Sequence, residues 1–261
     1  FCYQCEQRAA NGGCRVMGVC GKDSQTAALQ DLLIHASQGV SMYAHRARAL
    51  GASDREIDLF VVEALFTTVT NVNFDPERLA GLIRRAAQLR DKARDMYIRA
   101  SAASGTASGK AKEGAQAAPD LGGPARFAPA DDLAGLVKQG EEASATWAAR
   151  SSAVGPDAAG VADLALFGLK GMAAYADHAQ ILGVEDAEVY GFFHEAMGFL
   201  ARDRCWGQRL TPEVGIVGAE DALPHHRRLG RARRTRRLCP PSRWRARLLA
   251  RDRPRLGADA L

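Results

Sequence analysis

The chain has 261 residues, 47% of them hydrophobic, and a formal net charge of +5. This length and composition are ample for a buried core, and no run of about 18 apolar residues suggests a membrane span. The charge is uneven, because residues 1–201 carry 19 basic and 24 acidic side chains, whereas residues 202–261 carry 16 arginines, no lysine and 6 acidic side chains. The sequence therefore predicts an acidic body followed by a basic tail.

The first segment, residues 1–22, is a loop that holds four of the six cysteines in a C-x2-C-x8-C-x5-C pattern: Cys2, Cys5, Cys14 and Cys20. Cysteines this dense on a glycine-rich loop indicate a metal centre more than core packing. Cys2 and Cys5 lie within a single turn and can therefore occupy two coordination positions of one metal centre. The nearby bases Arg8, Arg15 and Lys22 would offset the charge of four thiolates.

Three interpretations of the cysteines stay open at this point. An iron–sulfur cluster is favoured, since it is wider than one ion and tolerates the x8 and x5 gaps. Structural zinc is second, because zinc sites usually pair two short knuckles and only the first pair has that spacing. Disulfides are third, because the rest of the chain is typical of an intracellular helical protein without a signal peptide.

Residues 23–100 predict a first helical bundle. The apolar positions from Leu29 to Ala47 follow i, i+3, i+4 spacing, with Ser24 as the expected cap and an end at Gly51. Ser53 to Glu56 forms a capping box for a second helix, and Asp75-Pro76-Glu77 is typical of a third helix start. The third helix is expected to run through Met96, which completes an antiparallel bundle.

Residues 101–130 are rich in Ala, Gly, Ser and Pro and predict a linker, after which residues 131–201 predict a second, partial bundle. Residues 31–64 and 163–196 align without a gap, with thirteen identities in thirty-four positions, including Tyr43/Tyr175. We interpret this as a duplicated helical unit.

The shared mid-helix glycines Gly39 and Gly171 each cost about 1 kcal/mol relative to alanine, so close helix approach is expected at both. The predicted fold class is all-α: two repeated three-helix-bundle-like units after an iron–sulfur cysteine loop, the second unit incomplete.

Residues 202–261 lose the helical pattern and carry 13 arginines in the 37 residues from His225. Such sequence is what a GC-rich gene yields when read out of frame, so we expect a frameshift near residues 201–205, or a disordered tail. The rival hypothesis is a nucleic-acid arm whose arginines neutralise phosphates. Against it, the body is acidic and Trp244 is the only aromatic residue among them. Cys205, Cys239 and His225-His226 are assigned no metal.

Several segments resemble hybrid-cluster proteins, also called prismane proteins or hydroxylamine reductases. The resemblance covers about residues 1–201, and the segments that carry it are Phe1 to Gln7, Gly13-Cys14, Gly18 to Lys22, Leu29 to Leu33, Tyr43-Ala44, Thr70 to Asn73 and Leu169 to Ala176. In this family the C-x2-C-x8-C-x5-C form is associated with a 4Fe-4S cubane. The resemblance therefore implies that Cys2, Cys5, Cys14 and Cys20 are the cubane ligands.

The resemblance also implies a function. The family reduces hydroxylamine to ammonia, and nitric oxide reduction is ascribed to it as well, at a second, hybrid iron–sulfur–oxygen cluster. The histidine, glutamate and cysteine ligands of that cluster belong to later domains and cannot be placed on this chain. A small redox protein would supply electrons, and a cytoplasmic location is expected. We therefore expect the electron-transfer domain of such an enzyme, inactive alone.

Two alternatives remain: a non-catalytic iron–sulfur electron-transfer or binding module, and a zinc-stabilised, Arg-tailed nucleic-acid binder. His35, His45 and His178 are expected to be partly buried or surface helix residues rather than ligands. His194-Glu195 does not complete an H-E-x-x-H motif, because position 198 is Gly. No Ser/His/Asp arrangement is evident from the sequence.

Overall fold

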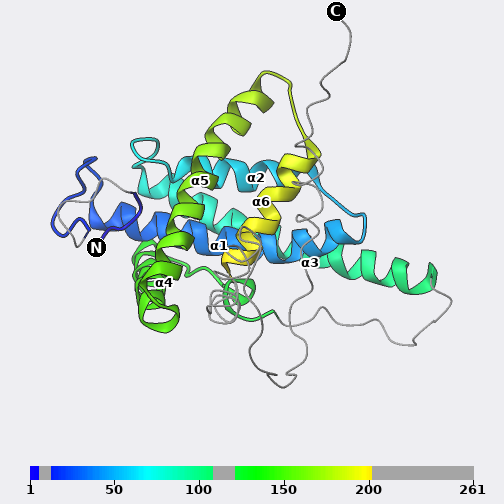
Figure 1. Cartoon of the computed structure of the whole chain (residues 1–261), viewed down its shortest axis with the longest axis horizontal. Helices are drawn as coiled ribbons and strands as arrows, with labels where there is room; N and C mark the ends of the chain where they lie inside the picture. Colours follow the sequence, from blue (N-terminus) through cyan, green and yellow to red (C-terminus); the bar gives the residue numbers. More distant parts are fainter. Residues whose placement is uncertain (6–12, 108–120, 202–261) are drawn as a thin grey trace, which may run out of the picture. The chain divides into compact units, whose positions relative to one another are not determined.

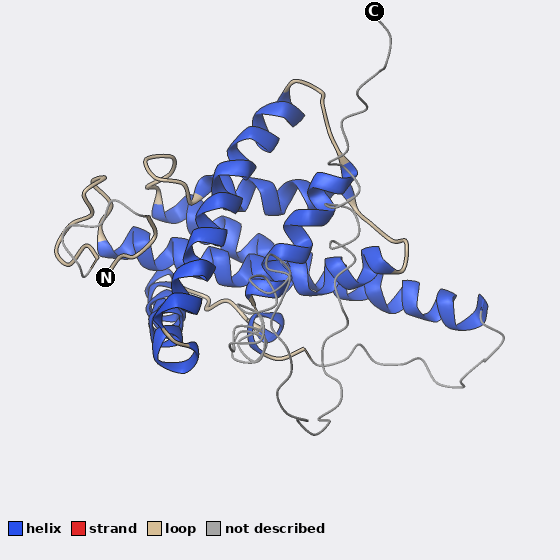
Figure 2. Cartoon of the chain, viewed as in Figure 1, coloured by secondary structure: helices blue, strands red, loops and turns tan. Residues whose placement is uncertain are grey.

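The structure is a computed structural model that describes residues 1–5, 13–107 and 121–201. Within these ranges it consists of six α-helices, one short 3-10 helix (η2) and loops, with no strand, as Figures 1 and 2 show. This confirms the expected all-α fold class for the described part of the chain. All described residues belong to one compact unit, Phe1–Glu213. The predicted tail, residues 202–261, lies outside the described residues.

Helix α1 (Ser24–Ala49) is the central element and packs against α3 (Pro76–Ala107), α4 (Leu133–Val154) and α6 (Ala187–Leu200). It can do so because small Ala, Ser and Gly residues accompany its leucines, so that buried residues lie on every side. Its N-cap is Asp23, whose carboxylate accepts a hydrogen bond from the Thr26 N–H at 2.7 Å. The expected Ser24 cap is therefore wrong by one residue, because Asp23 is the one with extended backbone.

An aspartate side chain also caps the N-termini of the next two helices. Helix α2 (Arg55–Thr67) begins after Asp54, which caps the Glu56 and Ile57 N–H groups at 3.0 and 3.2 Å, so Asp54 replaces the expected Ser53 cap. Helix α3 begins at Pro76 as predicted, with Asp75 capping it. It continues to Ala107, past Met96 and into the predicted linker, because alanine favours helix in that stretch. Residues 108–120 lie outside the described residues, and η2 (Gly123–Arg126) follows them.

Glycines allow the closest approaches to α1. A Cβ atom on Gly39 would collide with the carbonyl oxygen of Pro124 in η2, so the close approach predicted there is confirmed. The same prediction for Gly171 is wrong, because nothing described lies within 4 Å of a Cβ atom at that position. Gly140 of α4, which the sequence did not single out, instead packs directly on the Ala28 carbonyl group.

The two aligned segments form matching helical hairpins, α1–α2 and α5 (Pro156–Ile181)–α6. An equivalent leucine, Leu50 or Leu182, caps the C-terminal end of each long helix. A glycine with positive φ follows it, with φ of 85° at Gly51 and 80° at Gly183. Each short helix then starts after an aspartate cap, Asp54 or Asp186. The hairpins pack crosswise, since α1 contacts α6 and α2 contacts α5. These features support the proposed duplication.

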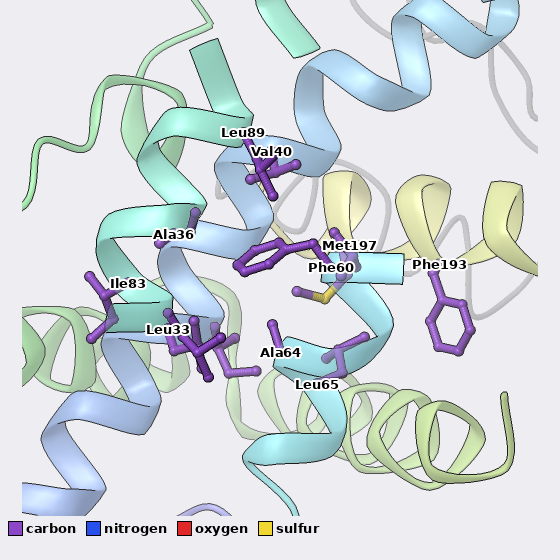
Figure 3. Close-up of a cluster of buried hydrophobic side chains, with 14 of the residues drawn as sticks. Leu33, Ala36, Val40, Phe60, Ala64, Leu65, Ile83, Leu89, Phe193 and Met197 are labelled. Carbon is purple, nitrogen blue, oxygen red and sulfur yellow. The ribbon is translucent and has the colours of Figure 1, made fainter. Parts of the chain in front are cut away.

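The helices of both hairpins share one hydrophobic core. Figure 3 shows Phe60 and Leu65 of α2 among side chains from α1, α3 and α6, including Leu33, Ile83, Phe193 and Met197. Phe60 and Phe193 are almost completely buried. The described helices therefore form one packed body that holds the N-terminal loop against α1. The finer division into residues 1–22, 23–100, 101–130 and 131–201 stays a prediction.

Equivalent faces of the two long helices differ in burial. Tyr43 of α1 is 4% exposed, whereas its equivalent on α5, Tyr175, is 80% exposed. Helix α3 packs along α1, and no described element takes the same place on α5. Other large apolar residues are exposed on α5, namely Val161, Leu164, Met172 and Ile181. Among the described residues, no helix is long and apolar enough to cross a membrane.

Candidate metal centre

Two of the four cysteines are paired through their backbones. The Cys2 N–H donates to the Cys14 carbonyl at 3.1 Å, and the Cys14 N–H donates to the Cys2 carbonyl at 3.0 Å, which makes an isolated antiparallel bridge. Gly13 permits it, because φ is 74° there and a Cβ atom would lie 2.7 Å from the Cys2 carbonyl oxygen. Both cysteines are buried. The bridge thus fixes the two ends of the loop whose middle, residues 6–12, lies outside the described residues.

A tight turn positions Cys20. The Gly18 N–H donates to the Lys22 carbonyl and the Gly21 N–H donates to the Gly18 carbonyl, both at 2.8 Å. Gly21 has φ of 87°, a value that residues with side chains rarely adopt. The turn leads directly to Asp23, which caps α1. The start of the central helix therefore anchors the last cysteine of the pattern.

All four cysteines line one cavity of about 410 Å³. The other described residues of its walls come from the N-terminal loop and the turn after α2: Gln4, Gly18, Val19, Lys22, Thr70 and Asn71. No disulfide joins any two of these four cysteines. Within the described residues, no three Cys, His, Asp or Glu side chains converge as ligands of a single ion. The cysteines line one shared space, and their thiolates are the ligand type that iron–sulfur clusters use.

The polar surroundings of the cavity come from residues that the sequence analysis did not assign. The Gln4 side-chain amide donates to the Ala27 carbonyl and to an Asp31 carboxylate oxygen, both at 2.8 Å. Gln30 of α1 donates to the Asn73 carbonyl at 2.8 Å. Gln4, Gln30 and Asn73 all lie within segments that resemble hybrid-cluster proteins, and that resemblance was the available signal. These amides bind the cysteine loop to α1, and α1 to the turn after α2.

The three bases expected near the cysteines have different positions. Lys22 is only 2% exposed and lines the cavity. Its ammonium group donates to the side-chain oxygens of Gln4, at 2.6 Å, and Gln30. Arg15 is exposed, and Arg8 lies outside the described residues. Of these bases, Lys22 is the one that the structure places in the cavity wall.

Burial dominates the electrostatics of the centre. It raises the pKa of the Cys2 thiol, although a backbone hydrogen bond at Gln4 and the charge of Lys22 act in the opposite direction. It also lowers the pKa of Lys170 to about 8, against the opposing effect of Asp31, while the pKa of Asp31 is raised. A bound metal would have to replace the Cys2 proton, because only the thiolate is a ligand.

None of the histidines in the described part of the chain lines the cysteine cavity. His35 and His45 are half-buried and His178 is exposed, as expected of helix residues. His194 is different, because its buried ring lies between Ser41, at 3.2 Å, and Asp58, at 2.8 Å. No sequence pattern indicated this arrangement, because His194 is more than 130 residues away from both Ser41 and Asp58. Ser41 and His194 have no exposed surface, so the group is a structural contact within the core. Cys205, Cys239 and His225-His226 lie outside the described residues.

An all-α body that carries a four-cysteine cavity at its amino-terminal end defines a helical protein of the iron–sulfur type. The sequence model of the Prismane/CO dehydrogenase family matches residues 1–220, and the chain belongs to this family. Iron–sulfur clusters are therefore part of the chemistry that its membership implies.

Curated relatives give the same result. The hydroxylamine reductase of Rhodospirillum rubrum is 52% identical over 202 residues, and that of Geobacter sulfurreducens is 47% identical over 201 residues. Each match covers 77% of this chain and 34% of the relative. The hydroxylamine reductase of Acidiphilium cryptum is 49% identical over 223 residues, which cover 84% of this chain and 38% of the relative. The chain thus spans about a third of the length of the curated relatives that it matches.

Proposed function

We propose that this chain is the amino-terminal electron-transfer part of a hydroxylamine reductase of the hybrid-cluster type. In this proposal Cys2, Cys5, Cys14 and Cys20 bind one 4Fe-4S cluster. The observation that carries the proposal is the single cavity that all four thiols line. The similarity to relatives named hydroxylamine reductase supports the same assignment.

The residues of the chain suit electron transfer better than substrate chemistry. Such a cluster, when bound, accepts and releases single electrons. Four cysteines can each bind one iron, which leaves no iron open to a substrate. Cys2 and Cys14 are buried, whereas Cys5 and Cys20 are half-buried. A small redox protein would therefore deliver electrons on the side of Cys5 and Cys20.

We further propose that the complete protein reduces hydroxylamine to ammonia, and nitric oxide as a second substrate, at a hybrid cluster carried by the other two thirds of its length. The 261-residue chain alone should then show no hydroxylamine reductase activity, even with its cluster assembled. The measurement is turnover with a reduced dye as electron donor, before and after the missing domains are restored. Cluster-dependent turnover by the purified chain would contradict this division of roles.

The binding test is anaerobic reconstitution with iron and sulfide, followed by metal and sulfide analysis. We expect iron and sulfide in equal amounts and broad visible absorption from thiolate-to-iron charge transfer. A colourless protein with one tightly bound zinc would instead support the zinc-stabilised alternative. We also propose a cytoplasmic location for the protein.

A further inference from the structure

Lys22 is a buried cation in the wall of the cysteine cavity. It is 2% exposed, and the acceptors of its ammonium group are the side-chain oxygens of Gln4 and Gln30. Both acceptors are neutral amides. Among the described residues, no carboxylate forms an ion pair with Lys22. The amide of Gln4 separates Lys22 from Asp31, because its nitrogen donates to Asp31 while its oxygen accepts from Lys22. The two glutamines therefore orient the charge of Lys22 without neutralising it.

A charge in this position has a cost. Removing an ammonium group from water is strongly unfavourable unless an opposite charge compensates it, and amide dipoles compensate only in part. The space beside Lys22 is the cavity that Cys2, Cys5, Cys14 and Cys20 line. Four thiolates around iron carry net negative charge, so an occupied cavity would supply the missing counter-charge.

We propose that Lys22 is the built-in counter-charge of the cluster and raises its reduction potential. The inference rests on the proposed function, since it assumes that the four cysteines bind a cluster. Reduction adds one negative charge to an anionic centre. A fixed positive charge in a buried setting stabilises the reduced state more than the oxidised state, because little water screens the interaction. Lys22 acts through the cluster and does not bind substrate.

The test compares Lys22→Met, which keeps the length of the side chain without its charge, with Lys138→Met on the exposed face of α4. The iron and sulfide content of the reconstituted wild-type protein is measured first. If the wild type binds no cluster, the proposed function itself is wrong. With the cluster bound, redox titration should show that the equilibrium constant for reduction is tenfold smaller in Lys22→Met than in the wild type. For a one-electron step, this corresponds to a reduction potential that is about 59 mV lower. Lys138→Met should match the wild type. An unchanged potential in Lys22→Met would overturn the role of Lys22.

A second measurement separates charge compensation from simple packing. In the cluster-free protein, Lys22→Met should leave the thermal midpoint unchanged or raise it, because removing a buried ammonium group that forms no ion pair with the described residues offsets the loss of its two hydrogen bonds to amide oxygens. A marked fall of that midpoint would show that Lys22 is a structural residue and overturn the proposal. If Lys22→Met binds no cluster, the variant Lys22→Arg, which keeps the positive charge, tests whether that charge is needed. Cluster binding by Lys22→Arg near the wild-type potential would support the need for charge, and failure of both variants would overturn it.

Discussion

The Nε2 atom of His194 lies 2.8 Å from a carboxylate oxygen of Asp58, and this contact joins α6 to α2 inside the core. An ionised carboxylate only accepts hydrogen bonds, so the ring donates at Nε2 and, when neutral, accepts from the Ser41 hydroxyl at Nδ1. Arg48 of α1 forms an ion pair with the other oxygen of Asp58 at 2.5 Å. One polar group thus ties α6 to α1 and α2, two helices that lie more than 100 residues earlier in the sequence.

Replacing His194 with Ala should destabilise the folded body by about 2–4 kcal/mol, because the change leaves a cavity and takes a hydrogen-bond partner from both Ser41 and Asp58. The measurement is the free energy of unfolding in urea. The control is His178→Ala on the exposed face of α5, which should change stability by less than about 1 kcal/mol. Equal losses from the two variants would contradict a structural role for the His194 contact.

Asp58 should also make stability depend on pH in the acid range. Burial opposes its ionisation, but hydrogen bonds from His194 and Arg48 outweigh burial, so its pKa in the folded protein is below the ordinary 3.8. A lowered folded pKa means that the stabilisation is complete above the unfolded value and is lost as pH falls through the folded value.

The check is a series of unfolding curves between pH 7 and about pH 2. The variant Asp58→Asn should be less stable than the wild type at neutral pH and should lose less stability on acidification. Asp91→Asn, at an exposed position on α3, is the matched control. A steeper acid dependence in Asp58→Asn than in the wild type would show that the sign is wrong.

The cysteine assignment predicts a sharp difference between the two ends of the chain. Cys5→Ser or Cys14→Ser should abolish stoichiometric iron binding in anaerobically reconstituted protein, because serine is a poor substitute for a thiolate ligand. Cys205→Ser and Cys239→Ser should leave the iron content unchanged. Equal loss of iron from all four variants would remove the case for an amino-terminal site.

The equivalent glycines of the two hairpins give a matched pair of substitutions. Gly39→Ala should destabilise the protein by about 1–3 kcal/mol, because the new methyl group collides with the Pro124 carbonyl oxygen. Gly171→Ala should stabilise α5 by up to about 1 kcal/mol, because the position is helical and open. Thermal unfolding of the two variants measures the difference. The reverse order would mean that the close approach lies at Gly171.

Residues 1–201 alone should keep the helical circular dichroism and the metal content of the whole chain. The reason is that helical periodicity stops there in the sequence while the net charge changes sign. Re-reading the coding DNA around residues 195–210 in all three frames tests the proposed frameshift directly. A large loss of helix on removing residues 202–261 would show that the tail is folded and that the frameshift hypothesis is wrong.

Local sequence was sufficient for the helix content and for the metal centre hypothesis. Asp75-Pro76 predicted the start of α3 because capping and proline geometry act within one turn. The end of α3 was harder to predict, because alanine-rich sequence suits both a helix and a linker. The cysteine spacing likewise identified its candidates, since all four lie within twenty residues.

Relationships between distant residues were decided only by tertiary structure. Local charge could not distinguish Lys22 from Arg15, and packing of the loop against α1 buried the first and left the second exposed. Periodicity likewise treated Gly39 and Gly171 as equals, but only Gly39 faces a neighbouring backbone. The Asp58–His194 contact spans 136 positions, so no local pattern could encode it. Sequence alone determined which segments are helical and which cysteines gather, because capping, periodicity and spacing act over a few residues. Burial and partners depended on how α1 to α6 pack, because packing joins residues that the chain keeps far apart.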